Sequence, residues 1–300
     1  MRSWPENAFL ETPAERGRLA TARYVILPVG YEGTTCYGQG TRHGPDAIIE
    51  ASTQIEDFDE QLHDLLWRAG IHTHPHVLGE QAWAPEKAQE RIFAAAAPLA
   101  AAGKTIIALG GEHSITTALV RAARTRWPDL TVLHFDAHAD LRESYQSQRH
   151  SHACVMRRLH EAGVPFVSVG VRSYCRQEYE FMQAHGLAPL APEEVAADLP
   201  GAVERILARL GPRVYITFDI DALDPAVAPG TGTPEPGGLS YRQALAILEA
   251  PCRGRQVVAA DIVEVMPIAG NLVTEVTAAR LAAKIIGYTQ AARPGPGAGS

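Results

Sequence analysis

Short apolar runs and longer segments of helical length alternate along most of the chain. The runs rich in Val, Ile, Leu and Ala have the length of strands that are buried on both faces. The expected strands are 24–29, 105–109, 130–135, 165–171, a short one at 187–190, 213–218 and 256–263. The expected helices are 45–52, 85–102, 114–126, 152–162, 174–185, 200–210, 240–250 and 273–290. This alternation predicts βαβ units, and therefore a parallel sheet with helices on both faces.

The same pattern predicts one α/β domain with short extensions at its two ends. The domain is expected over residues 21–290. Residues 1–20 are polar and are expected to form an irregular N-terminal arm. Residues 291–300 end in a low-complexity Pro/Gly stretch, which predicts a disordered tail.

Composition narrows the class of protein. The chain has 300 residues, of which 46% are hydrophobic and 20% charged, as is usual for a soluble globular protein. Its net charge of −7 argues against a nucleic-acid surface. There is no apolar run near the roughly 20 residues that span a bilayer, and the first residues lack the apolar core of a signal peptide. The four cysteines form no Cys-x-x-Cys pair and read as reduced thiols, so we expect a cytoplasmic protein.

Candidate metal ligands follow the strand at 130–135. Asp136, His138 and Asp140 are spaced by two, so an extended backbone would place all three side chains on one side. The alternative is a half-exposed strand whose outer face is polar, because apolar and polar residues also alternate here. This segment alone does not distinguish the two interpretations.

Two other strands end in the same kind of residue. Asp219 and Asp221 follow the strand at 213–218, and His113 follows the Gly-Gly break after 105–109. Ligands of open parallel sheets bind beyond the carboxyl ends of the strands. If these strands are neighbours, four carboxylates and two imidazoles meet there, and the carboxylates oppose one another's ionisation. Divalent cations would resolve that conflict, so the sequence predicts a metal site.

Six ligands suffice for two ions. An oxygen-rich set with some imidazole suits manganese better than zinc. Two-metal sites hold their ions about 3.5–4 Å apart and activate a bridging water to hydroxide. We expect Asp136 and Asp219 to touch both ions.

Two residues outside the ligand set are expected to act with Asp140 in catalysis. His152 lies twelve positions after Asp140 and is a candidate proton shuttle, the alternative being a surface histidine. Glu264 ends the strand at 256–263, where a buried carboxylate needs a cationic partner. Two divalent ions do not neutralise the predicted carboxylates together with a hydroxide, so a cationic substrate fits. A planar guanidinium suits best, because a carboxylate grips it through two parallel hydrogen bonds.

The motifs that carry these residues resemble those of a known family. They read Gly-Gly-Glu-His-Ser (110–114), Asp-Ala-His-Ala-Asp (136–140) and Phe-Asp-Ile-Asp-Ala-Leu-Asp-Pro (218–225). Together with Gly-Thr-Thr (33–35) and Asp-Ile-Val-Glu-Val (261–265), they resemble the signature motifs of the ureohydrolases, the arginase/agmatinase family. The resemblance covers residues 24–290.

The resemblance implies a three-layer α/β/α sandwich with a mostly parallel central sheet, as in arginases and deacetylases. It implies two Mn²⁺ ions, or Ni²⁺ as in guanidine-hydrolysing relatives, and release of urea from a small guanidino substrate. One ion would be held by His113, Asp136, Asp140 and Asp219, and the other by Asp136, His138, Asp219 and Asp221. His152 matches the family's proton-shuttling histidine and Glu264 its guanidinium-facing glutamate. Homotrimers or homohexamers are usual in the family.

Within the family, the stretch 147–154 and the Pro-Glu-Pro-Gly-Gly-Leu segment at 234–239 resemble the agmatinase branch. This implies hydrolysis of agmatine to urea and putrescine in polyamine biosynthesis. Residues 266–270 lack the Asn-Pro and nearby Asp that many relatives carry, so aminopropylagmatine, guanidinobutyrate, guanidine and arginine stay open as substrates. Two alternatives belong to other classes. A single-zinc, deacetylase-like amide hydrolase would not need His113 and Asp140, and an inactive binding protein would lack ligands.

Overall fold

One seven-stranded sheet forms the centre of the molecule. The computed structural model describes residues 8–78 and 83–292. The strands lie in the order β4-β1-β5-β9-β8-β6-β7, and all six pairings between them are parallel. Their bounds are β4 (Ile71–Thr73), β1 (Tyr24–Val29), β5 (Thr105–Gly110), β9 (Gln256–Val263), β8 (Arg213–Asp219), β6 (Thr131–Phe135) and β7 (Phe166–Val169). A separate antiparallel hairpin joins β2 (Phe58–Asp59) to β3 (Asp64–Leu65).

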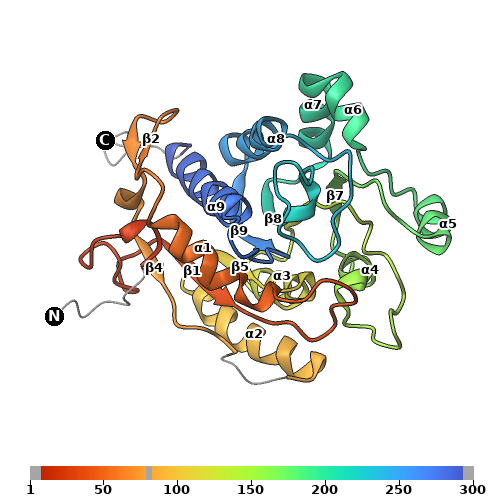
Figure 1. Cartoon of the computed structure of the whole chain (residues 1–300), viewed down its shortest axis with the longest axis horizontal. Coiled ribbons are helices and arrows are strands. Elements are labelled where there is room, and N and C mark those ends of the chain that lie inside the picture. The colour runs from red at the N-terminus through yellow and green to blue at the C-terminus, as the bar shows by residue number, and fades with distance from the viewer. Residues whose placement is uncertain (1–7, 79–82, 293–300) are drawn as a thin grey trace.

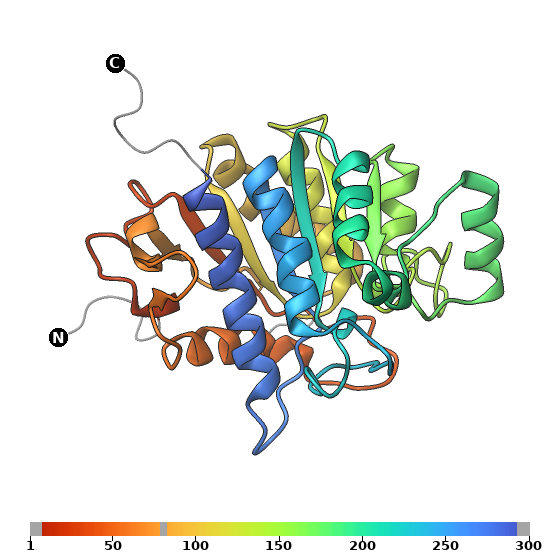
Figure 2. The ribbon, with the colours of Figure 1, turned by 90° about the horizontal axis from the view of Figure 1, so that it is seen from above.

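Helices cover both faces of this sheet (Figure 1). One face packs against α1 (Gly44–Ser52), α6 (Pro192–Ala197), α7 (Leu199–Arg209), α8 (Tyr241–Gly254) and α9 (Val273–Ala291). The other packs against α2 (Pro85–Ala101), α3 (Thr116–Arg124), α4 (Val155–Glu161) and α5 (Arg176–His185). Figure 2 shows α8 and α9 lying across the near face of the strands.

The two cores follow from the period-two geometry of the strands. In β1, Tyr24 and Ile26 join the core under α1, α8 and α9, whereas Val25 and Leu27 join the core under α2 and α3. Because every residue of the strand is buried, the sequence reads as a continuous apolar run. The predicted three-layer α/β/α sandwich with a mostly parallel sheet is confirmed.

Most predicted elements are present, with ends shifted by a few residues. The expected strand at 187–190 is wrong, because Leu190 makes only an isolated bridge to Val169. Helix α6 was not predicted. Within the segment expected to be an N-terminal arm, Phe9 and Leu10 are buried in the core. Of the predicted tail, residues 293–300 lie outside the described residues, and α9 runs on to Ala291.

The strand order places the predicted ligands. Strands β5, β9, β8 and β6 are consecutive neighbours, so their carboxyl ends form one continuous edge. The segments carrying His113, Glu264, Asp219 and Asp136 leave from that edge. Within the described residues, no helix is both long and apolar enough to cross a membrane.

A buried ion pair joins the β2–β3 hairpin to α9. Lys284 Nζ lies 2.8 Å from Asp59 Oδ2, and both side chains are almost fully buried. The ammonium also donates to Glu60 and Gln61. Asp59 accepts two backbone N–H groups of its own turn, so its charge is fixed in place.

We predict that Lys284→Met destabilises the protein by about 3–5 kcal/mol, because it leaves the Asp59 carboxylate buried without its cation. The control is Arg68→Met, which breaks the exposed pair of Arg68 with Asp64 and should cost less than about 1 kcal/mol. Urea denaturation monitored by circular dichroism measures both. Equal destabilisation of the two variants would contradict the assignment.

Candidate metal centre and active site

The first half of the candidate centre surrounds His113. This residue opens a 3-10 turn (His113–Ile115) directly after β5. Its Nδ1 lies 3.1 Å from Asp136 Oδ2, 3.1 Å from Asp140 Oδ2 and 3.4 Å from Asp219 Oδ2. All four side chains are buried. Despite these distances, Nδ1 makes no hydrogen bond.

The other ring nitrogen of His113 explains the orientation of Nδ1. Thr217 Oγ1 donates its proton to Asp261 Oδ1 at 2.6 Å, so it can only accept from His113 Nε2, 2.9 Å away. In the neutral imidazole the proton is therefore on Nε2, and the lone pair of Nδ1 points at the carboxylates. A histidine whose outer nitrogen donates to a fixed acceptor is the usual arrangement of a metal ligand.

The second half surrounds His138. Its Nδ1 lies 3.0 Å from Asp221 Oδ2 and 3.4 Å from Asp136 Oδ1. Asp136 therefore stands between the two halves, with one carboxylate oxygen towards each histidine. Asp219 is placed differently, because its Oδ1 accepts the Asp221 N–H at 2.9 Å.

The close packing of buried carboxylates in the cluster favours the binding of cations. Burial and the neighbouring Asp221 and Asp136 charges raise the pKa of Asp219 well above its usual range. Burial and Asp136 likewise raise the pKa of Asp140 to about 6. Two overlapping sets of ligand atoms are close enough to hold an ion. They are His113, His134, Asp136 and Asp140 in one, and Asp136, His138 and Asp221 in the other. The unpaired Nδ1 of His113 and the acid-rich donor set fit two divalent ions.

Sequence reasoning missed His134. Its Nε2 lies 2.9 Å from Asp136 Oδ2 and its Nδ1 lies 2.9 Å from Ser168 Oγ, within the buried sheet. It lies two positions before Asp136 and four before His138, so extending the i, i+2 pattern backwards by one step would have found it. His134 holds the shared carboxylate in place from the strand side.

Glu264 is brought to the same cavity. It follows β9 with a φ of 62° and is buried, and its Oε1 accepts the His113 N–H at 2.7 Å. Burial and the charge of Glu112 raise the pKa of this carboxyl well above its usual range. Asp140 also has a positive φ, 52°. Such left-handed backbone is strained for residues other than glycine and clusters at functional sites.

His152 is held on the rim through a chain of contacts that the sequence did not reveal. Glu112 Oε2 accepts the N–H groups of Gly33 and Thr34, and its Oε1 accepts the Thr34 hydroxyl at 2.6 Å. Thr34 Oγ1 in turn accepts the His152 N–H at 3.1 Å and lies 3.3 Å from its Nδ1. Glu112 thus ties the loop that carries Gly33 and Thr34, and with it His152, to the turn that carries His113.

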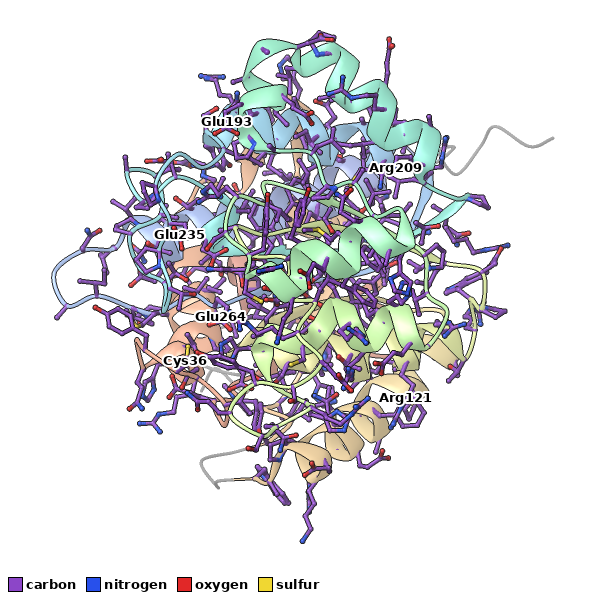
Figure 3. All side chains as sticks on the ribbon, turned by 90° about the vertical axis from the view of Figure 1, so that its right-hand side faces the viewer. Cys36, Arg121, Glu193, Arg209, Glu235 and Glu264 are labelled. Carbon is purple, nitrogen blue, oxygen red and sulfur yellow. The ribbon has the colours of Figure 1, made fainter. Side chains whose placement is uncertain are left out.

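One cavity of about 350 Å³ lies beside these residues. His113, His138, Asp140, His152 and Glu264 all contribute to its wall. Figure 3 shows Glu264 on the same side of the molecule as Cys36, which lines the mouth, and Glu235. A larger hollow of about 780 Å³ lies at the opposite edge of the sheet, but none of its lining residues is an acid or a histidine. The smaller cavity is therefore the candidate active site.

The comparisons with known proteins agree with this geometry. The sequence model of the Arginase family matches residues 22–287. A protein of Synechocystis named N(1)-aminopropylagmatine ureohydrolase is 37% identical over 93% of each chain. An agmatinase of Pyrococcus horikoshii is 35% identical over 89% of this chain and 92% of its own. The crystal structure of agmatine ureohydrolase of Thermoplasma volcanium superposes with a TM-score of 0.86, covers 96% of each chain and is 28% identical.

We predict that the affinity for divalent cations rises with pH. Without metal, burial opposes the charged imidazolium, but Asp221 and Asp136 raise the pKa of His138 to about 12. Metal binding must therefore release that proton, and log affinity should fall by about one unit per pH unit between about pH 8 and pH 6 for each proton displaced.

Competition titration of Mn²⁺ against a chelator at several pH values measures this slope. Below about pH 6 the slope should steepen, because Asp140 then also carries a proton. In the control His138→Ala, metal binding should displace about one proton fewer, so the slope of log affinity against pH should be smaller by about one unit. An affinity that does not depend on pH would contradict the ligand assignment.

Proposed function

The chain belongs to the arginase family and is a hydrolase, and we propose that it releases urea from a small cationic guanidino compound. Agmatine is the leading substrate, with putrescine as the second product. Relatives named agmatinase and N(1)-aminopropylagmatine ureohydrolase support this choice. Aminopropylagmatine is the first alternative, because it carries the same guanidinobutyl group on a longer amine.

The observation that carries the proposal is the placement of Glu264 beside the acidic cluster. The cluster offers the carboxylates of Asp136, Asp140, Asp219 and Asp221, and two divalent ions would neutralise these four charges. Glu264 adds a further carboxyl group to the cavity wall, and those two ions do not neutralise it. A guanidinium matches it in charge and, with two parallel N–H groups, in shape.

The proposed cofactor is a pair of Mn²⁺ ions, since the donor set is mostly oxygen. When bound, the two ions supply Lewis acidity that makes a water nucleophilic at neutral pH. We assign His113, Asp136, Asp140 and Asp219 to one ion and Asp136, His138, Asp219 and Asp221 to the other. Asp136 has the geometry of a shared ligand, with one oxygen towards each histidine.

His152 is proposed to move the proton. Thr34 Oγ1 gives its own proton to Glu112, so in a hydrogen bond between Thr34 and His152 the Nδ1–H is the donor, and we assign that tautomer. The lone pair is then on Nε2, which lies at the cavity mouth, 3.6 Å from Cys36 Sγ. Burial is the largest cause that lowers the pKa of His152, to about 4, so the imidazole is neutral at pH 7. It can accept a proton there and pass it to the leaving amine.

We also propose that the protein acts in polyamine biosynthesis in the cytoplasm, as a homotrimer or homohexamer. All four cysteines are free thiols, which suits a reducing compartment. A single-metal amide hydrolase is disfavoured, since two candidate ligand sets share Asp136 and one ion would need only one of them.

We predict that the Mn²⁺-loaded protein releases urea from agmatine. Glu264→Gln should lower kcat/KM at least about 10²-fold, because the guanidinium loses a charge-assisted bidentate partner. A colorimetric urea assay on agmatine, aminopropylagmatine, guanidinobutyrate, guanidine and arginine measures both results. Absence of urea with every compound, with Mn²⁺ and with Ni²⁺, would refute the function.

We predict that His152→Asn lowers kcat by about 10²–10⁴-fold, since the proton transfer loses its acceptor. The metal content, measured by plasma mass spectrometry, should stay at two ions per chain, because His152 is not among the proposed ligands. The matched control is His76→Asn at an exposed histidine, which should keep full activity. Loss of metal in His152→Asn, or unchanged kcat, would contradict the role of His152.

A further inference from the structure

The loop 230–237 runs past the cavity, and its Thr233 lines the cavity wall. At one end, the N–H of Met266 donates to Gly230 O at 2.8 Å, and a Cβ on Gly232 would lie 3.8 Å from Glu264 Oε2. Three residues further on, Glu235 Oε1 accepts the Ser173 hydroxyl at 2.8 Å. Three residues span at most about 10 Å, and an extended four-carbon chain with its terminal nitrogens spans roughly 7 Å. Glu235 is therefore within reach of the far end of a guanidinobutyl substrate.

The backbone of this loop is held rigidly by Arg172. Its guanidinium donates to the carbonyl oxygens of Glu235 at 2.6 Å and Pro236 at 3.1 Å, and to that of Asp221 at 2.8 Å. The same group also donates to the Gly170 carbonyl at 3.0 Å. Arg172 thus fixes the loop 230–237 to the turn that carries Asp221. Its N–H groups are directed at carbonyls rather than at the Glu235 carboxylate.

The charge of Glu235 is left unmatched. Among the described residues, its one ion contact is His138 Nε2 at 3.9 Å, which is too long for a hydrogen bond. The side chain is 37% exposed. Its Oε1 is oriented by Ser173, and no hydrogen bond to Oε2 is present in the described part of the chain. A rigid, oriented and unpaired carboxylate at the rim is suited to receive a cation.

The rest of the rim favours a cation over an anion. Arg142 also lines the cavity, but its guanidinium is 3.9 Å from Glu178 Oε2 and lies over the Tyr145 ring, 4.9 Å from the centroid. The positive charge of Arg142 is thus partly compensated by Glu178 and the Tyr145 ring. Tyr174, next to Ser173, is 48% exposed and presents an aromatic surface of the kind that attracts ammonium groups.

We propose that Glu235, oriented by Ser173 and flanked by Tyr174, is a subsite for an ammonium group on the tail of the substrate. The subsite selects guanidino compounds with cationic tails against those with neutral or carboxylate tails. This inference rests on the proposed function, since it places the guanidinium at Glu264. A longer polyamine tail fits the same subsite through its internal amine.

The test compares substrates of equal length that differ only in the tail. Agmatine has an ammonium, butylguanidine a methyl group and 4-guanidinobutanoate a carboxylate. In the Mn²⁺-loaded protein, the ratio of kcat/KM for agmatine to that for butylguanidine should fall about tenfold in Glu235→Gln, the size of a partly exposed charge-assisted hydrogen bond. The matched control is Glu193→Gln at an exposed position of α6 (Figure 3), which should leave the ratio unchanged.

A binding measurement separates this proposal from the proposed function. Calorimetry should show that Glu235→Gln lowers the binding affinity for 1,4-diaminobutane about tenfold relative to the affinity for 1-aminobutane. This result is expected whether or not any guanidino compound is hydrolysed. If no urea is released but this binding difference is found, the function fails and the subsite stands. An unchanged agmatine preference, better turnover of 4-guanidinobutanoate than of agmatine, or loss of metal from Glu235→Gln would each overturn the subsite. The last outcome would mean that Glu235 positions His138 instead.

Discussion

Mutual repulsion of buried carboxylates is the constraint on which the site depends. Asp136, Asp140 and Asp219 are held within 3.5 Å of one imidazole nitrogen, and burial raises the pKa of two of them. Apolar side chains at these positions would give a more stable fold, because buried charges without partners lower the free energy of unfolding. The arrangement is reasonable only when bound cations neutralise these carboxylates, and Glu264 is then the carboxylate that we propose for binding a cationic substrate.

The fold maintains this arrangement by rigid means. The four strand ends that carry the acids and His113 are neighbours in a sheet buried on both faces. A Cβ on Gly111 would lie 1.9 Å from the Tyr31 carbonyl oxygen, so the turn leading into His113 requires glycine. Asp140 and Glu264 adopt left-handed backbone that their residue types disfavour. Glu264 is held in this conformation because its N–H donates to the Gly111 carbonyl and its Oε1 accepts the His113 N–H.

The sequence was sufficient for features that depend on local pattern. Apolar runs located the strands, and the i, i+2 spacing of Asp136, His138 and Asp140 located candidate metal ligands at the end of one of them. Features that depend on tertiary neighbours could not be read in this way. Arg172 is an ordinary arginine in the sequence, and only the folded loops around it show that its donors meet backbone carbonyls. The partnership of Glu112 with Thr34 spans 78 positions, and no local pattern predicts it. The expected strand at 187–190 failed because Leu190 has one bridge partner and no ladder.

The central claim is that two cations share the Asp136 carboxylate. An anomalous difference map from crystals grown with Mn²⁺, recorded near the manganese absorption edge, tests it most directly. We predict two peaks about 3.5–4 Å apart, one beside His113 Nδ1 and the other beside His138 Nδ1, with an oxygen of Asp136 next to each. A single peak, or peaks away from Asp136, would contradict it.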